Sequence, residues 1–247
     1  MNALKQIPSP GRKKRGGQSR VMTFYIVRLA YRSIIFVMAL AGYIYTCVHP
    51  ESQILRESVT VIRIIWLIFA FEILLRFFPN QLESRGCQKM FARNFIPTGS
   101  RSARLKGRRR DALVLILWLC INTVFGMLHL AGVLDAGMMI LICLAWSVGD
   151  LLCVLFYCPF QSLLMKNKCC VTCRIFPWDH AMAFAPLIFV PGIYTWSLLA
   201  LAIILGVRWE IAIRLHPEQF SEATNGYLSC ASCTDNLCRS KLYMPRR

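Results

Sequence analysis

Cysteine is the residue type that offers the clearest chemistry in this 247-residue chain, and six of its twelve cysteines fall in two short clusters. The first cluster reads Cys-Cys-Val-Thr-Cys over 169–173, and the second reads Cys-Ala-Ser-Cys-Thr-Asp-Asn-Leu-Cys over 230–238. Each contains a C-x-x-C pair, whose spacing lets two thiolates of one tight turn converge on a metal ion. We therefore expect a four-thiolate metal site, most simply for zinc, with the ligands Cys170, Cys173, Cys230 and Cys233.

Three nearby side chains are candidates for additional ligands, namely Cys169, Cys238 and His180. Four thiolates can also bind an iron–sulfur cluster, although the chain lacks the C-x2-C-x2-C-x3-C-P run of bacterial ferredoxins. A redox-active dithiol is a third interpretation, and unconnected thiols or a simple disulfide in an exported tail form a fourth. The remaining cysteines lie in apolar runs or a basic loop, where we expect ordinary small side chains.

Ionisable residues inside long apolar runs form a second group of candidates, because charges in a membrane are costly and usually have a partner or a function. Arg32, Glu72 and Asp150 are predicted to lie at similar depth, with Asn122 nearby. They form either a structural pairing layer or part of a substrate or proton path. Glu72 and Arg76 are spaced i,i+4, so these two charges can alternatively neutralise each other on one helix.

Long apolar runs dominate the elements that must position these residues. The chain is 56% hydrophobic, with a mean hydropathy of +0.50. A membrane-spanning helix needs roughly 20 apolar residues. The sequence therefore predicts an all-α polytopic membrane bundle with four clear spans, at about 24–47, 58–78, 112–134 and 137–160.

The net charge of +17 is concentrated in segments that we expect in the cytoplasm. Residues 1–20 carry no acid, and residues 79–110 carry nine Lys and Arg residues against Glu83 alone. The alternation of basic and neutral loops predicts a multi-pass protein of the cell inner (plasma) membrane with a cytoplasmic N-terminus. Arg28 lies near a span end, where we expect its side chain to snorkel to the surface.

Residues 178–214 allow two topologies. A single kinked helix would extend about 46 Å between Trp178 and Trp209, because a helix rises about 1.5 Å per residue. A hairpin turning at Pro191-Gly192 would return the tail to the cytoplasm, on arms too short to cross a bilayer fully. Basic residues in the tail favour the hairpin, and a shared cysteine site requires it. Three regions follow: a basic arm over 1–20, a four-span bundle over 21–160 and a cysteine-rich region over 161–247.

A basic run precedes the third predicted span. At about 1 kcal/mol per basic residue near the surface, it can bind anionic lipid headgroups. The competing interpretation, which we favour, is a topological anchor. We do not expect nucleic-acid binding, because no aromatic interleaving accompanies the charge. The candidate headgroup contacts are Arg104, Arg108, Arg109 and Arg110.

These features favour a non-enzymatic membrane protein in which a cytoplasmic cysteine site, occupied by zinc, organises a surface that contacts a protein partner or lipid. Motifs of the common enzyme classes are absent, and no stretch outside the apolar runs is large enough for a catalytic domain. The first alternative is a membrane redox protein with an iron–sulfur centre or reactive dithiol. The second is a small transporter using Glu72 and Asp150.

Overall fold

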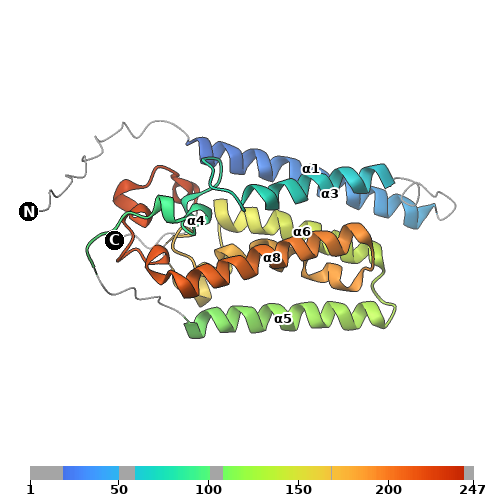
Figure 1. Cartoon of the computed structure of the whole chain (residues 1–247). Coiled ribbons are helices and arrows are strands. Elements are labelled where there is room, and N and C mark those ends of the chain that lie inside the picture. The colour runs from blue at the N-terminus through green and yellow to red at the C-terminus, as the bar shows by residue number, and fades with distance from the viewer. Residues whose placement is uncertain (1–18, 50–58, 101–107, 168, 242–247) are drawn as a thin grey trace, which may run out of the picture.

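The described residues of the computed structural model, 19–49, 59–100, 108–167 and 169–241, form an elongated helical bundle (Figure 1). Within these ranges the only β pairing is an isolated bridge between Pro97 and Asn225, so the predicted all-α class is confirmed. The long helices are α1 (Arg20–Val48), α3 (Val59–Leu75), α5 (Arg108–Leu130), α6 (Ala136–Leu155) and α8 (Ile193–Leu215).

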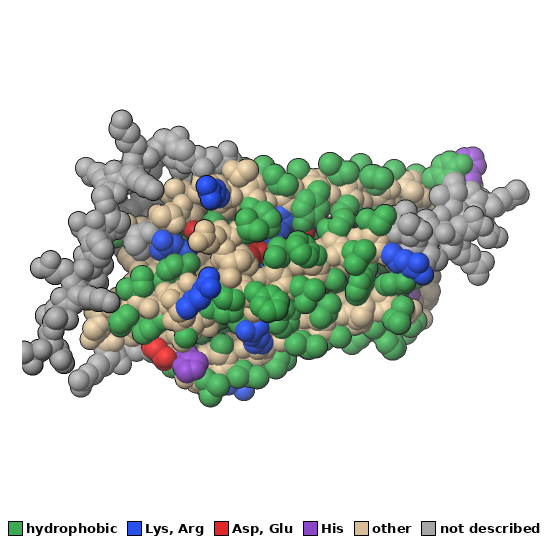
Figure 2. Space-filling model, turned by 45° about the horizontal axis from the view of Figure 1, so that its top comes forward, with side chains coloured by type: hydrophobic (Ala, Val, Ile, Leu, Met, Phe, Trp, Pro, Cys, Tyr) green, Lys and Arg blue, Asp and Glu red, His purple; other side chains and the backbone are tan. Residues whose placement is uncertain are grey.

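Three described helices are long and apolar enough to cross a membrane: Arg20–Val48, Arg109–Leu130 and Ala136–Leu155. Helix α3 lies within the second predicted span and has 17 residues. Figure 2 shows hydrophobic side chains along the visible long side of the bundle. Side chains such as Val37, Leu119 and Ile204 are exposed there or elsewhere on the bundle, which suits a lipid environment better than water.

Local signals set several helix ends. Asp135 caps α6, because its carboxylate accepts a hydrogen bond from the Met138 backbone N–H at 2.7 Å. Helix α5 ends at Leu130, and Gly132 follows with a φ of +74°, a left-handed conformation that glycine adopts without strain. This helix therefore begins and ends earlier than the predicted 112–134.

A broken segment precedes α8. It consists of η3 (Phe176–Trp178), α7 (Asp179–Phe184) and η4 (Ala185–Phe189), and it packs against α6 and α8. Prolines interrupt helical hydrogen bonding in η3 and η4. Trp178 donates its indole N–H to Glu210 of α8 at 2.7 Å, so the start of this segment lies beside the far end of α8.

One end of the bundle is covered by short elements from the middle and the end of the chain: α4 (Arg85–Gln88), η1 (Ala92–Asn94), η2 (Phe160–Leu164), η5 (Pro217–Phe220), η6 (Gly226–Leu228), η7 (Cys230–Ser232) and η8 (Leu237–Ser240). Arg85 connects them, donating its backbone N–H to Asp235 at 2.6 Å and its guanidinium to the Tyr227 carbonyl at 2.7 Å. The Ser19 hydroxyl also donates to the Asp235 carbonyl. The tail is thereby attached to both α4 and the start of α1.

Two apolar cores stabilise this arrangement. The first lies between α3, α6, α7 and α8 and includes Phe69, Phe184 and Trp209. The second lies at the covered end and includes Tyr25 of α1 and Leu151 of α6. This second core also contains residues of the cysteine region, namely Cys170, Cys173, Ile175, Phe176 and Leu237.

Candidate functional site

Both C-x-x-C pairs form tight turns. The Cys173 backbone N–H donates to the Cys170 carbonyl at 3.0 Å, and the Cys233 N–H donates to the Cys230 carbonyl at 3.3 Å. Cys170 and Cys173 are buried, whereas Cys230 is exposed and Cys233 is half-buried. All twelve cysteines are free thiols. The turns therefore have the local geometry that two metal-binding knuckles would use.

The fold brings the two clusters to the same end of the bundle. Lys241, just after the second cluster, places its Nζ 2.8 Å from the Cys170 Sγ. Leu237, inside the second cluster, shares an apolar core with Cys170 and Cys173. We call residues 169–173 and 230–238 together the cysteine cap.

Cys169 of the first cluster interacts electrostatically with the tail thiols. Burial raises the pKa of Cys169 to about 11, and three tail cysteines add to the rise, in the order Cys238, Cys230 and Cys233. Burial raises the pKa of Cys238, and Cys233 and Cys230 add to the rise. Cys169 is thus close enough to the tail thiols for their charges to affect it.

Cys170 and Cys173 have different surroundings. The Cys170 thiol donates to Gln161 at 3.3 Å, and the Cys173 Sγ lies 3.9 Å from the Met165 Sδ. No three His, Cys, Asp or Glu side chains converge to hold a metal ion in the part of the chain that the structure describes. A metal would therefore require the thiols of the cysteine cap to move together.

Two lysines lie beside the buried thiols. Lys89 donates from its Nζ to the carbonyls of Val171, at 2.9 Å, and Cys173, at 3.1 Å. Burial lowers the pKa of Lys89 to about 8. Burial raises the pKa of Cys170 to about 12 while Lys241 opposes the rise. Metal binding at such thiols would have to release their protons, so its strength would increase with pH.

His180 lies in a different environment from the one expected for an additional ligand. Its Nδ1 is 2.9 Å from Asp179 Oδ1, and its Nε2 is 3.9 Å from Glu72 Oε2. Its ring therefore sits between two carboxylates of a buried ionic network, which is the second candidate site.

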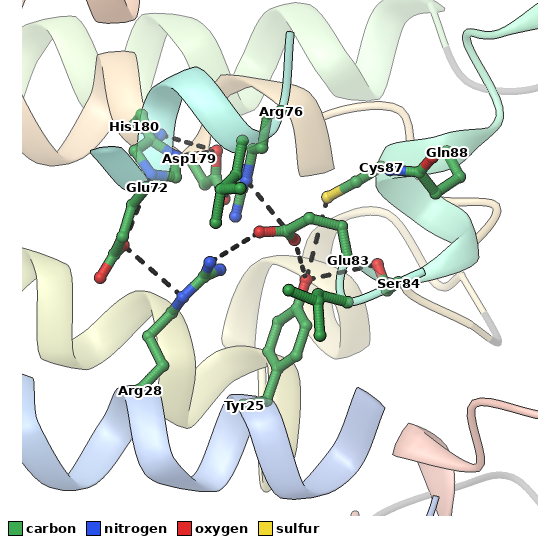
Figure 3. A network of polar contacts seen from close by, with 12 residues as sticks. Tyr25, Arg28, Glu72, Arg76, Glu83, Ser84, Cys87, Gln88, Asp179 and His180 are labelled. Atoms are coloured by element: carbon green, nitrogen blue, oxygen red, sulfur yellow. Dashed lines mark hydrogen bonds and ion pairs between the residues drawn. The ribbon is translucent and has the colours of Figure 1, made fainter. Parts of the chain in front are cut away.

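This buried ionic network joins α1, α3, α6, α7 and the loop after α3. Figure 3 shows the part of it around Arg28, Arg76 and Glu83. Arg28 donates from Nη2 to Glu83 at 2.6 Å, and Arg76 donates from Nη1 to Asp179 at 2.5 Å. Arg32 donates to Glu72 and also to the Ser147 carbonyl, the latter at 2.7 Å. The ionisable members are Arg28, Arg32, Glu72, Arg76, Glu83, Asp150, Asp179 and His180.

Longer contacts connect these pairs to one another. The Arg28 Nε lies 3.6 Å from Glu72, and the Arg76 Nε lies 3.7 Å from Glu83. The Tyr25 hydroxyl donates to Glu83 at 3.0 Å. Because a buried charge is strongly unfavourable without a partner, this pairing makes the relative positions of the helices depend on one another.

Several sequence predictions can be compared with these contacts. Arg32, Glu72 and Asp150 do come together, with Arg32 Nη1 4.0 Å from Asp150 Oδ2. The side chain of Asn122 is buried and donates to the Trp118 carbonyl of its own helix at 2.9 Å. The expectation that Arg28 snorkels is wrong: its side chain is fully buried, because Glu83 folds back over the end of the bundle to pair with it.

The i,i+4 alternative for Glu72 and Arg76 also differs from the observed pairing. Glu72 pairs with Arg28 and Arg32 of α1, whereas Arg76 pairs with Glu83 and Asp179. Each charge thus reaches another segment rather than its neighbour on α3.

Sequence reasoning missed Glu83 as a member of the network. Burial disfavours the charged form of Glu83, but the guanidinium groups of Arg28 and Arg76 outweigh that effect and lower its pKa to about 2. The available signal was composition, because Glu83 is the single acid of the basic segment 79–110. Tyr25 and Asp179 carried no comparable signal.

Three of the four candidate lipid contacts, Arg108, Arg109 and Arg110, lie at the start of α5. Arg109 and Arg110 are exposed, and Arg110 donates to the Met165 carbonyl at 3.2 Å. Arg108 begins the helix, and Arg104 lies outside the described residues.

No protein-family model, curated protein or solved structure matches this chain.

Proposed function

We propose that this chain is an integral membrane protein whose cysteine cap binds zinc at the cytoplasmic face and thereby organises a surface for a protein or lipid partner. The observation that carries the proposal is the placement of both C-x-x-C turns at one end of the bundle, although 57 positions separate Cys173 from Cys230. Such a site would stabilise the cap in the way structural zinc stabilises small domains, by joining distant segments through one ion.

We further propose four spans and a C-terminal hairpin, with both termini in the cytoplasm. The contact between Trp178 and Glu210 supports a reversal of the chain at Pro191-Gly192. The contacts of Arg85 with Tyr227 and Asp235 support a tail on the same side as the basic segment 79–110. By the positive-inside rule that side is cytoplasmic, where thiols remain reduced and available to a metal. The inner (plasma) membrane is the proposed location.

The ligand set can be narrowed by the surroundings of each thiol. In the tail cluster Cys230 is exposed and Cys233 and Cys238 are half-buried, and the charges of all three act on Cys169 of the first cluster. These four thiols are the favoured ligands. The originally expected pair Cys170 and Cys173 would then support the site from the apolar core beneath it.

Metal analysis of the purified protein, together with its absorption spectrum, tests the proposal. We expect about one zinc ion per chain, as in a single four-thiolate site, and no visible colour. Zinc should be lost from a Cys230→Ser/Cys233→Ser variant and retained by Cys120→Ser, which alters an exposed thiol on α5. Brown iron–sulfur absorption would instead establish the redox alternative, and metal-free protein purified without chelator would overturn both metal-based functions.

A further inference from the structure

The buried ionic network contains one more carboxylate than it has arginines. Each arginine has its own hydrogen-bonded acid: Arg28 has Glu83, Arg32 has Glu72 and Arg76 has Asp179. Within each of these three pairs, the positive charge of the arginine balances the negative charge of the carboxylate. Asp150 is the fourth acid, and it has no arginine of its own.

The contacts of Asp150 differ from those of the paired acids. Its nearest cation is the Arg32 guanidinium, at 4.0 Å, and that guanidinium already donates to Glu72 and to the Ser147 carbonyl. Within the described part of the chain, no hydrogen bond is found to the Asp150 carboxylate. An ionised Asp150 would therefore be a poorly compensated charge on a membrane helix.

Asp150 is also the member of the network that reaches the surface. The Asp150 side chain is 18% exposed, whereas the side chain of no other ionisable member of the network is more than 5% exposed. The other charged or titratable groups that face it come from three helices besides its own. They are Arg28 and Arg32 of α1, Glu72 of α3 and Arg76 just after it, Asp179 and His180 of α7, and Cys153 of α6.

The space beside Asp150 limits what can neutralise it. Asp150 lines a recess together with Arg32, Ser147, Asp179 and His180, and this recess is too narrow to admit a water molecule. A metal cation that keeps any of its water would not fit, whereas a proton needs no additional volume. The positive charge of Arg32 on the recess wall would also repel a metal cation placed in the recess.

We propose that Asp150 is a proton-binding site, occupied at neutral pH and open to exchange at the surface of the bundle. With Asp150 protonated, the three arginines balance the three paired acids and the His180 ring stays neutral. Loss of this proton leaves one uncompensated negative charge between α1, α6 and α7. The site is independent of the cysteine cap and of any metal bound there.

Infrared difference spectroscopy of the full chain in lipid nanodiscs tests the assignment directly. A protonated carboxyl group has a carbonyl stretch that a carboxylate lacks and that shifts when H₂O is replaced by D₂O. We expect this band at neutral pH in the wild type and in Asp135→Asn, which removes the capping acid at the other end of α6. The band should be absent from Asp150→Asn and should disappear from the wild type at alkaline pH.

The proposal would be overturned by the absence of a protonated-carboxyl band in the wild type at neutral pH, by a band that persists in Asp150→Asn, or by a charged His180 ring in the nitrogen NMR spectrum. Asparagine resembles the neutral acid in shape, so Asp150→Asn should fold at neutral pH. Failure of this variant to fold, under conditions where Asp135→Asn folds, would show that the negative charge itself is needed and would also refute the idea.

Discussion

At the scale of single residues, Glu83 has the most consequential position in the network. It accepts hydrogen bonds from Arg28 of α1 and from Tyr25, and it lies near Arg76 at the end of α3. Its side chain is fully buried. The Glu83 carboxylate, which comes from the loop after α3, therefore helps to balance the guanidinium charges of Arg28 and Arg76.

We expect Glu83→Gln to destabilise the protein by about 3–5 kcal/mol, because it leaves buried guanidinium charge without its partner. Thermal unfolding in a mild detergent would measure the loss. Glu218→Gln is the matched control, since Glu218 forms an exposed pair with His216, and exposed pairs contribute about 0–1 kcal/mol. Equal stability of the two variants would contradict a structural role for Glu83.

Glu83 should also make the stability of the fold depend on pH. The folded-state pKa of Glu83 is lowered to about 2 from an ordinary value of 4.5. Its contribution to stability should therefore be complete above about pH 4.5 and decline as the pH falls toward 2. The fall in the unfolding temperature over this interval should be smaller in Glu83→Gln than in Glu218→Gln, and parallel curves would argue against the assignment.

At the scale of elements, the bundle combines extended helices with one broken segment. The α7 and η4 residues lie among α5, α6 and α8, and Phe189 at the end of η4 faces Gly126 of α5. A Cβ added at Gly126 would lie 2.2 Å from the Phe189 ring. The absence of a side chain at Gly126 thus lets α5 approach the broken segment.

Gly126→Ala is expected to destabilise the protein by about 1–3 kcal/mol, the usual cost of overpacking. Gly149→Ala is the control, because a Cβ at that position of α6 meets nothing within 4 Å and alanine favours a helix. Thermal unfolding of both variants compares these effects. Replacing Phe189 by Leu should partly restore Gly126→Ala, and a fully stable Gly126→Ala would show that α5 packs differently.

At the scale of the whole molecule, one end of the bundle collects the start of α1, the α4 segment, the first cysteine cluster and the tail. The proposed topology places this end in the cytoplasm. Two regions far apart along the chain would then lie in the same compartment, and the cysteine cap would be a single structure.

Thiol labelling of intact cells that express single-cysteine variants of the protein tests this topology. An impermeant reagent should fail to label Cys230, which is exposed in the fold, until the membrane is permeabilised. A cysteine introduced by Ser52→Cys should be labelled without permeabilisation, because residue 52 lies between the first two predicted spans, 24–47 and 58–78, and so outside when the N-terminus is cytoplasmic. Labelling of Cys230 in intact cells would place the tail outside and remove the shared cytoplasmic site.

The sequence by itself determined features that depend on local chemistry. Apolar runs predicted the helical class and the approximate positions of α1, α5 and α6. A run of about 20 apolar residues can span a bilayer whichever other segments it packs against, so its length alone is informative. The depth of Arg32, Glu72 and Asp150 within their runs also predicted that these charges meet.

Only the tertiary structure decided which partners those charges have. Glu83 contacts Tyr25 and Arg28 across more than fifty positions, and Asp179 pairs with Arg76 across more than a hundred. The same holds for the cysteines, since spacing selected Cys170 and Cys173, whereas in the fold the charges of the tail thiols act on Cys169. The physical reason is that a side chain's partner depends on how loops return over the bundle, and residue spacing describes only the turn in which that side chain lies.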